Sequence, residues 1–259
     1  MPLTTRALRE KLSAGHVVSG EELSEVDWGA ITAVDGQFED CVAEDAAFIG
    51  VDFTGARFAR CSFVRCRFSQ VVLRDARLED CAFGGRDVEN AGSFGFCELR
   101  EAVLLRCNLA FCRFERSGFY GIALDGCDLR GARFRHADFS HAISRKTIAI
   151  QASLRNCNLD FADLAAIRLP GCELSGSRLR EADLSDADLT DADLRDCDLT
   201  LAALAGARLA GADLRGADVS GLNLTTLASL SGLKITAAQQ HVLLAALGVD
   251  VSALEHDRF

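Results

Sequence analysis

The sequence lacks the residue groupings on which most enzymes depend. Its 259 residues include a single tyrosine, Tyr120, and five histidines, and no serine or cysteine nucleophile with an orienting base is evident. Gly84-Gly85 is too short to cradle a phosphate, and neither a P-loop nor a dinucleotide-binding fingerprint is present. We therefore predict a protein that is not an enzyme and that uses no cofactor and no small-molecule substrate.

Long apolar runs are also missing. No apolar stretch reaches the roughly 18 residues needed to span a membrane, and the start, Met1-Pro2-Leu3-Thr4, lacks the apolar run of a secretory signal. These absences favour a soluble protein of the cytoplasm that makes no membrane contact.

What the sequence does have is a five-residue rhythm. From Leu154 to Leu224 every fifth residue is Leu or Val, and most of these central residues have Ala or Cys two positions earlier. The same rhythm runs through two earlier blocks, whose central residues are Phe48, Phe53, Phe58, Phe63, Phe68, Leu73, Leu78 and Phe83 in one and Phe94, Leu99, Leu104, Leu109, Phe114, Phe119, Leu124, Leu129, Phe134 and Phe139 in the other.

A period of five fits neither the turn of an α-helix nor the alternation of an ordinary strand. It fits a quadrilateral β-helix, in which four pentapeptides make one square coil and successive coils stack. The central residue and the small residue two positions before it fill the shaft at close packing, while the other three face water. The predicted fold is an all-β solenoid of roughly nine coils, on the order of 45 Å long at about 4.8 Å per coil, with two ends that need caps.

The eleven cysteines obey the same rhythm. Each lies two residues before a central position, the place that Ala, Val, Ile or Ser takes elsewhere, and there is no CxxC pair and no Cys/His cluster at zinc spacing. Because a free cysteine behaves as a small apolar residue, we predict reduced, buried cysteines and no metal site.

Two segments interrupt the repeats. In the first, 84–93, Phe94 follows Phe83 by eleven residues, so the register slips by one; the second, 143–150, keeps the register but loses the core residues. Loops that leave a regular scaffold commonly carry function, although a tolerated insertion is the other interpretation of each. As partner-binding residues we predict Arg86, Asp87, Glu89 and Asn90 in the first loop and Ser144, Arg145, Lys146, Thr147 and Ile148 in the second.

The ends of the chain differ from its middle. Thr236 followed by Gln239 is a capping-box signature, and Gly248 ends the helix that it begins. We predict an N-terminal helix or cap in 1–37, the β-helix in 38–230, and a C-terminal helix and tail in 231–259. Leu23 and Trp28 are in phase with the repeats, so the coils could begin earlier than residue 38. The C-terminal helix should cap the shaft and pair with its twin in a homodimer through Leu243, Leu244 and Leu247.

The charge is banded. Residues 1–59 carry 11 acids against 4 bases, residues 60–159 carry 11 against 16, and residues 160–230 carry 13 against 6. A dense acidic surface on a rod resembles DNA electrostatically, although aspartates also keep a leucine-rich solenoid soluble. The residues of the predicted acidic surface are Asp183, Asp186, Asp188, Asp191, Asp193, Asp196 and Asp198.

Blocks such as Ala182-Asp183-Leu184, Ala187-Asp188-Leu189 and Ala212-Asp213-Leu214 are similar to the signature of pentapeptide repeat proteins. From about Cys81 onward the chain also resembles the Qnr-type quinolone-resistance branch. The shared course includes a first loop that opens with Arg86-Asp87, a second loop after Phe139, and a leucine-bearing helix that ends at Leu247-Gly248.

This resemblance implies a right-handed coil and a dimeric, DNA-shaped rod. It also implies that the rod binds DNA gyrase or topoisomerase IV, with no nucleic acid bound directly, and protects the enzyme from drugs that trap the cleaved complex. The two loops would be needed for that protection.

The sequence departs from the Qnr pattern in its extra N-terminal coils, its basic middle band, and Arg145 and Lys146 in the second loop. A self-immunity protein guarding its producer's gyrase is a related interpretation. The alternative from another class is a scaffold whose basic band, around Arg100, Arg106, Arg113 and Arg116, binds an acidic partner.

Overall fold

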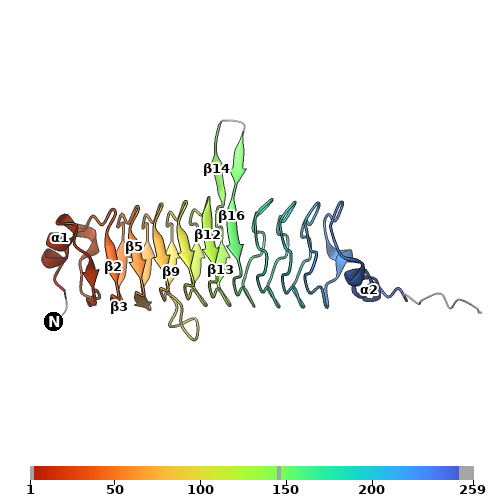
Figure 1. Cartoon of the computed structure of the whole chain (residues 1–259), viewed down its shortest axis with the longest axis horizontal. Helices are drawn as coiled ribbons and strands as arrows, with labels where there is room; N and C mark the ends of the chain where they lie inside the picture. The colour runs from red at the N-terminus through yellow and green to blue at the C-terminus, as the bar shows by residue number, and fades with distance from the viewer. Residues whose placement is uncertain (1–2, 145–146, 251–259) are drawn as a thin grey trace, which may run out of the picture.

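The chain folds into one long rod of stacked coils with a helix at each end (Figure 1). The structure is a computed structural model and describes residues 3–144 and 147–250. The helices and strands have these bounds: α1 Thr5–Ser13, β1 Val18–Ser19, η1 Trp28–Ala30, β2 Gln37–Glu39, β3 Val42–Glu44, β4 Ala47–Ile49, β5 Arg57–Ala59, β6 Ser62–Val64, β7 Arg67–Ser69, β8 Arg77–Glu79, β9 Ser93–Gly95, β10 Val103–Leu105, β11 Arg113–Glu115, β12 Ile122–Asp125, β13 Arg133–Arg135, β14 Ser140–Ala142, β15 Ile148–Ile150, β16 Ala152–Arg155, η2 Leu224–Thr226 and α2 Ala237–Ala246.

The strands lie on four sides of the rod, which confirms the predicted square coil. Side 1 is the parallel sheet β1-β2-β5-β8-β10-β12-β16, side 2 begins with β3 and β6, and side 3 is the sheet formed by β4, β7, β9, β11 and β13. Side 4 is joined by single parallel bridges, such as Thr32 to Asp52. Residues twenty apart are register partners, as in Phe38 with Phe58, because four pentapeptides complete one coil.

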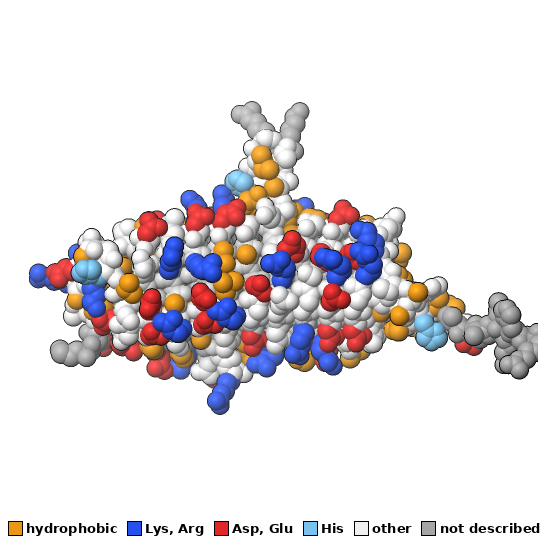
Figure 2. Space-filling model, viewed as in Figure 1, with side chains coloured by type: hydrophobic (Ala, Val, Ile, Leu, Met, Phe, Trp, Pro, Cys, Tyr) orange, Lys and Arg blue, Asp and Glu red, His pale blue; other side chains and the backbone are white. Residues whose placement is uncertain are grey.

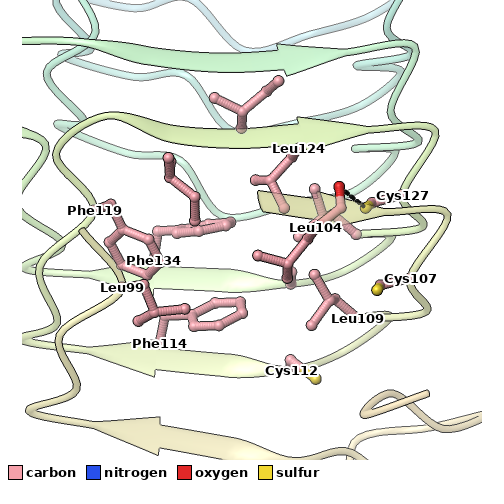
Figure 3. Close-up of a cluster of buried hydrophobic side chains, with 14 of the residues drawn as sticks. Leu99, Leu104, Cys107, Leu109, Cys112, Phe114, Phe119, Leu124, Cys127 and Phe134 are labelled. Carbon is pink, nitrogen blue, oxygen red and sulfur yellow. Dashed lines mark hydrogen bonds between the residues drawn. The ribbon is translucent and has the colours of Figure 1, made fainter. Parts of the chain in front are cut away.

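Aromatic and aliphatic residues divide the shaft between them. On side 3 five phenylalanine rings stack in one column, with centroids 4.6 Å apart for Phe48–Phe68 and for Phe68–Phe94, and 5.0 and 4.9 Å for the two further pairs, which end at Phe134. Figure 3 shows Phe114, Phe119 and Phe134 on one side of the buried leucines and the cysteines on the other. From Leu154 onward leucine takes the central positions and is at most 4% exposed as far as Leu214.

The corners of the coil explain the polar part of the repeat. At each tight corner the residue two after the central one has a positive φ, for example 58° at Asp186 and 57° at Asp191. This is the conformation that position i+2 of a type II turn requires, and Gly, Asn and Asp adopt it most readily. The aspartate before the central residue has another role, because Asp188 Oδ1 accepts a hydrogen bond from Thr190 N (3.3 Å) and Asp183 Oδ1 from Ser185 N (2.9 Å). The Ala-Asp-Leu signature therefore combines a small core residue, a turn cap and a large core residue.

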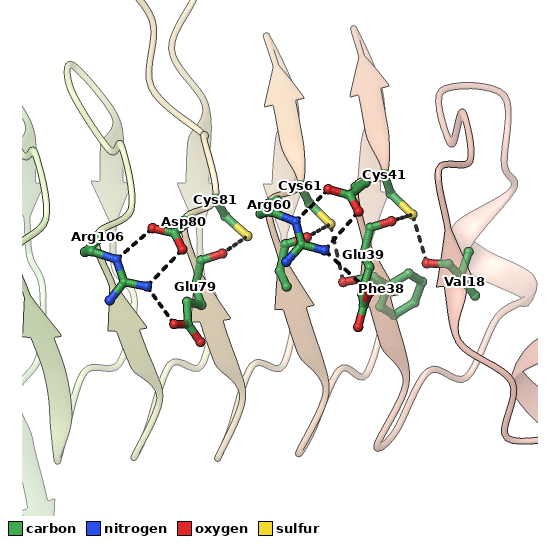
Figure 4. Close-up of polar contacts among 12 residues, drawn as sticks. Val18, Phe38, Glu39, Cys41, Arg60, Cys61, Glu79, Asp80, Cys81 and Arg106 are labelled. Carbon is green, nitrogen blue, oxygen red and sulfur yellow. Dashed lines mark hydrogen bonds and ion pairs between the residues drawn. The ribbon is translucent and has the colours of Figure 1, made fainter.

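The eleven cysteines are free and buried, as their spacing predicted. Six of them form one column in successive coils, and most of these donate to a carbonyl oxygen of the coil before, as from Cys41 Sγ to Val18 O (3.2 Å) and from Cys127 Sγ to Leu104 O (3.4 Å) (Figures 3 and 4). The column consists of Cys41, Cys61, Cys81, Cys107, Cys127 and Cys157. Ser177 takes the next place in it and donates to Leu154 O in the same way, at 2.7 Å.

We expect the free energy of unfolding to fall at alkaline pH because several of these buried thiols have raised pKa values. Burial raises the pKa of Cys66, Cys97 and Cys172 to about 11 and that of Cys112 and Cys197 to about 12, from 9.0. A folded-state pKa above the unfolded value means that the contribution is fully present below pH 9 and is lost as the pH rises through 11 to 12. At about 1.4 kcal/mol per unit, we expect urea unfolding under reducing conditions to show a loss of roughly 2–3 kcal/mol per thiol by pH 11.

The matched control is Cys197→Ser, because Ser177 already takes the same place one coil earlier. That variant should lose less stability between pH 8.5 and 11 than the parent protein. A free energy of unfolding that stays level across this range would contradict the prediction.

The coils begin one coil before residue 38, in agreement with the phase of Leu23 and Trp28. Val18 and Ser19 already pair in parallel register with Phe38 and Glu39, and Leu23 and Trp28 are 0% and 2% exposed. Only α1 precedes the coils, and its fully buried Leu8 closes the shaft. The sequence signal of this first coil is weak because Val18 and Ala33 replace Phe and Leu at two of its central positions.

At the other end, α2 begins with the predicted capping box between Thr236 and Gln239, which is confirmed. Gln239 is buried, and its Nε2 donates to Leu214 O (2.6 Å) and Ala217 O (2.8 Å). Leu243 is 3% exposed and belongs to the core of the shaft. These contacts attach α2 to the last coils as a cap.

Candidate partner-binding surfaces

Two excursions leave the rod at diagonally opposite corners (Figure 1). The first follows side 2 and the second follows side 4. On side 1, Leu78 pairs with Leu104, six residues more than one coil, and Leu124 pairs with Leu154, ten residues more. Six additional residues are one more than a whole pentapeptide, so the register slips by one at the first excursion. Ten are two whole pentapeptides, so the register is kept at the second. About two coils, or roughly 10 Å, separate the two exits along the axis.

The first loop is fastened at its base and at its tip. Gly92 N donates to Phe83 O (2.7 Å) and closes the base, while Gly84 lies so near the next coil that an added Cβ would be 2.4 Å from Ala110 N. Asp87 Oδ1 accepts from the backbone N–H groups of Glu89 and Asn90, at 3.1 Å each, and from Asn90 Nδ2 at 2.9 Å. Asp87 therefore shapes the loop, whereas Arg86 and Glu89 are exposed and free to meet a partner.

Asn90 ties this loop back to the rod. Its carbonyl oxygen and its Oδ1 both accept from Arg65, at 3.4 Å each. Arg65 also forms ion pairs with Asp45 and Glu44 of the previous coil. The loop is consequently held in one orientation beside side 3.

The second excursion is an antiparallel hairpin rather than an irregular loop, and it begins earlier than predicted. Strand β14 pairs with β15 in the register Ser140–Ile150, His141–Ala149 and Ala142–Ile148. The Tyr120 and His141 rings meet at its base with centroids 5.0 Å apart. The hairpin projects from the rod as an arm, and hydrophobic side chains are visible along it (Figures 1 and 2).

Two isoleucines stand uncovered near the end of this arm. Ile143 and Ile148 are each 64% exposed. The turn closes through Thr147 N, which donates to Ser144 Oγ at 3.1 Å. Arg145 and Lys146, also predicted as contacts, lie outside the described residues. An exposed apolar pair on a projecting arm is a surface suited to protein contact.

The residues of the predicted acidic surface form a belt round the rod. Consecutive pentapeptides pass round the coil, so the run from Asp183 to Asp198 encircles the rod, and each side presents only a few of its carboxylates. Asp193 is paired with Arg195 (2.7 Å) and Asp198 with Arg180 (3.7 Å). The side chain of Asp186 extends over the next coil, where its Oδ1 would lie 2.1 Å from a Cβ added to Gly206. The corner residues Asp186, Asp191 and Asp196 carry carboxylates that cap no turn.

Ion pairs neutralise part of the positive charge of the basic band, residues 60–159. Arg60 binds Asp40 through Nε (2.7 Å) and Nη2 (2.9 Å), and Arg106 binds Asp80 in the same manner, at 2.8 and 2.9 Å (Figure 4). The Arg60 guanidinium holds the pKa of the Asp40 carboxyl below its usual range. Arg100 lies 3.5 Å from Glu98. Of the band proposed from the sequence, Arg100 and Arg106 are therefore neutralised, whereas Arg113 and Arg116 are not.

The C-terminal end of the rod is apolar. Between Ala237 and Ala246 the helix α2 has no charged residue, and hydrophobic side chains gather at this end of the rod (Figure 2). The exposed ones include Leu230, Ile235, Val242, Leu247 and Val249, at 36–47%. Of the three predicted dimer residues, Leu243 is used by its own shaft, Leu244 is half-buried and Leu247 is exposed.

Among the described residues there is no group of three or more His, Cys, Asp or Glu side chains placed to hold a metal ion. Within 3–144 and 147–250, no helix has the length and apolar character needed to cross a membrane.

Among solved structures, the rod is similar to that of QnrB1, a plasmid-mediated fluoroquinolone resistance protein. A trypsin-treated variant of QnrB1 is 25% identical, with a TM-score of 0.68 over 82% of this chain and 99% of that chain. The full-length protein is 24% identical, with a TM-score of 0.55 over 90% of this chain and 97% of that one, which shows the fold alone. None of the curated proteins matches the sequence significantly.

The family model for pentapeptide repeats matches most of the chain in overlapping stretches. The matched residues are 37–75, 52–85, 93–131, 112–143, 132–169, 152–196 and 192–226. They leave out most of the first loop, in agreement with its departure from the coil. The chain belongs to the pentapeptide repeat family.

Proposed function

We propose that this protein binds a bacterial type II topoisomerase, DNA gyrase or topoisomerase IV, as a DNA-mimicking homodimer and protects it from topoisomerase-poisoning antibiotics. The observation that carries the proposal is the likeness to QnrB1, which extends over 99% of that protein. The present protein would confer antibiotic resistance or self-immunity in the cytoplasm. It would act by binding the topoisomerase and would catalyse no reaction.

The two excursions support this function because they give an otherwise regular rod two specific contact points. Loops held by a rigid scaffold commonly carry the binding residues of a protein. Here Arg86 and Glu89 lie on one edge and Ile143 and Ile148 on the opposite edge. A rod seated on a topoisomerase could therefore touch the enzyme on two sides at once.

The acidic belt supplies the electrostatic part of the proposal. Residues 160–230 carry 13 acids against 6 bases, and basic grooves that normally hold phosphates would attract them. Pairing of two rods through α2 would bring both belts near the centre of a double-length particle. Val242, Leu247 and Val249, together with half-buried Leu244, are the side chains available for that pairing.

The first test is a supercoiling assay with purified gyrase and a fluoroquinolone, in which this protein is titrated. Rescue of supercoiling in the presence of drug would support the proposal, as would inhibition of the drug-free enzyme at higher dose. If neither occurs with gyrase or with topoisomerase IV, the proposed function is wrong.

Neutralising corner carboxylates should weaken topoisomerase binding. The double variant Asp186→Asn and Asp191→Asn keeps the positive φ, which Asn tolerates, and removes two charges from the belt. We expect roughly tenfold weaker binding at low salt, and a smaller difference at high salt because screening shortens the range of the attraction. Asp35→Asn with Asp75→Asn is the matched control, since both residues are exposed corner aspartates with φ near 55°. Equal losses in the two variants would contradict a role for the belt.

A further inference from the structure

Side 3 exposes a cluster of arginines that have no carboxylate partner. No ion pair within 4.0 Å joins any of them to an acid in the described part of the chain, and all five are exposed. We call them the side-3 arginines: Arg67, Arg113, Arg116, Arg133 and Arg135. Arg67, Arg133 and Arg135 were not predicted from the sequence. Arg113 and Arg133 are twenty residues apart in the chain and become neighbours only because successive coils stack.

Their arrangement brings like charges together. Arg113 is the register partner of Arg133, and Glu115 is that of Arg135, at the usual strand separation of about 4.8 Å. Like charges directly opposite each other on neighbouring strands are destabilising. The contrast is with the corner shown in Figure 4, where Asp40 meets Arg60 and Asp80 meets Arg106. Two acids are in register with this cluster, Glu115 beside Arg135 and Asp163 of the next coil beside Arg133, so the five arginines leave positive charge in excess on side 3.

The surface around these arginines is shaped for contact. One hollow is lined by Arg113, Phe114, Glu115, Arg133 and Arg135. The lining of a second hollow includes Arg67, Phe96 and Arg113. Phe96 is 56% exposed, and the guanidinium carbon of Arg116 lies 5.8 Å from the centroid of its ring. The first loop returns to the rod at Ser93, which is the register partner of both Arg67 and Arg113. The cluster is thus continuous with the base of that loop.

We propose that the side-3 arginines bind an extended acidic segment of a partner protein. Arg133 and Arg135 are two residues apart on one strand, roughly 6.8 Å, which equals the separation of alternate side chains in an extended segment. Guanidinium groups bind carboxylates in a bidentate manner. This contact is additional to the topoisomerase proposal and does not depend on it.

The charge of the whole chain favours a protein segment over a nucleic acid. The net charge is −10, and the bands on either side of the basic one, 1–59 and 160–230, are each net −7. A duplex carries a charge about every 1.7 Å and would be repelled by both acidic bands. A short acidic segment can lie within the side-3 cluster and avoid them.

The experiment measures fluorescence anisotropy of a labelled peptide of about twelve residues with Glu at alternate positions. The comparison probes are the same peptide with Gln, a DNA duplex of about 20 base pairs and inorganic phosphate. We expect the Glu peptide alone to bind at low salt, and Arg113→Glu with Arg133→Glu to weaken it at least about tenfold. The control is Arg57→Glu with Arg208→Glu, the same charge change at two exposed arginines on other sides, neither of which forms an ion pair within residues 3–144 and 147–250.

The melting temperature provides a second measurement. Arginines that only stabilised the fold would lower it when removed, whereas a binding cluster of like charges should not. Arg133→Ala removes a like-charge pair, so the unliganded variant should melt about 1–2 °C higher than the parent protein while it binds the Glu peptide more weakly. Equal binding by the parent and the charge-reversed protein would overturn the proposal. A preference for the duplex or for phosphate over the Glu peptide would also overturn it.

Discussion

Deletion of residues 141–150 is expected to abolish drug protection while the rod stays folded. The deletion removes the ten additional residues of the hairpin and joins Ser140 to Gln151. The shortened segment again reads as a pentapeptide, with Gln151 at the corner and Ala152 at the small core position before Leu154. Gln70 already occupies such a corner with φ of 56°, so the new corner has a precedent in this chain.

The expected loss is large because the arm presents the two most exposed isoleucines of the protein. Contacts that dominate an interface cost about 2 kcal/mol or more when removed, which is roughly thirtyfold in affinity. The measurement is the concentration of protein needed to restore gyrase supercoiling in the presence of a fluoroquinolone. Circular dichroism and thermal unfolding of the variant should nearly match the parent, because none of the described residues removed is fully buried and only Ile150, which is partly buried, packs against the core.

A matched deletion examines the other edge. Removal of residues 86–91 takes out the six additional residues of the first loop and leaves Gly84, Gly85, Gly92 and Ser93 between Phe83 and Phe94. Comparison of the two variants separates the contributions of the two edges. Full protection by the hairpin deletion would mean that the arm is a tolerated insertion and not a contact.

Phe68→Ala is expected to cause the largest loss of stability of any single change proposed for this chain. The Phe68 ring stacks between Phe48 and Phe94, with centroids 4.6 Å from each, and the residue is 3% exposed. Truncation of a buried phenylalanine to alanine typically costs about 3–5 kcal/mol. In a solenoid, a gap in one coil also weakens its contacts with both neighbours. Urea unfolding should show the loss as a lower midpoint.

Phe68→Leu is the control, because leucine takes the equivalent place in the C-terminal coils, for example at Leu164 and Leu184. A volume-conserving apolar change of this kind usually costs less than about 1.5 kcal/mol. A leucine variant with the midpoint of the parent would show that the ring stack adds nothing beyond filled volume. Similar midpoints for the alanine and leucine variants would contradict the expected benefit of refilling the space.

Much of the fold was readable from the sequence because the coil makes the same local demand every five residues. Each corner needs a residue that accepts positive φ, each side needs one large and one small core residue, and these demands recur as Ala-Asp-Leu. The cysteines obeyed the same rule, and their burial is confirmed. The sequence left the start of the coils open because Val18 and Ala33 are weaker signals than Phe or Leu at the central positions.

The candidate surfaces were less readable because they depend on what lies twenty residues away. Asp183 to Asp198 form a belt round the rod, but only the structure shows which of its carboxylates are paired, Asp193 with Arg195 and Asp198 with Arg180. Arg106 looks like part of a basic surface but is held by Asp80. Segment 143–150 looks like a loop, yet its backbone closes into a hairpin with β14.

By itself, the sequence determined the repeat, the square coil, the identity of the core residues, the places of the two insertions and the capping box of α2, because each of these is set by residues within a few positions of one another. The tertiary structure alone decided which corners carry the excursions, which charges cancel and which remain uncovered. Those properties arise between coils, where side chains twenty or more residues apart meet at the distance of neighbouring strands, and no local pattern encodes that meeting.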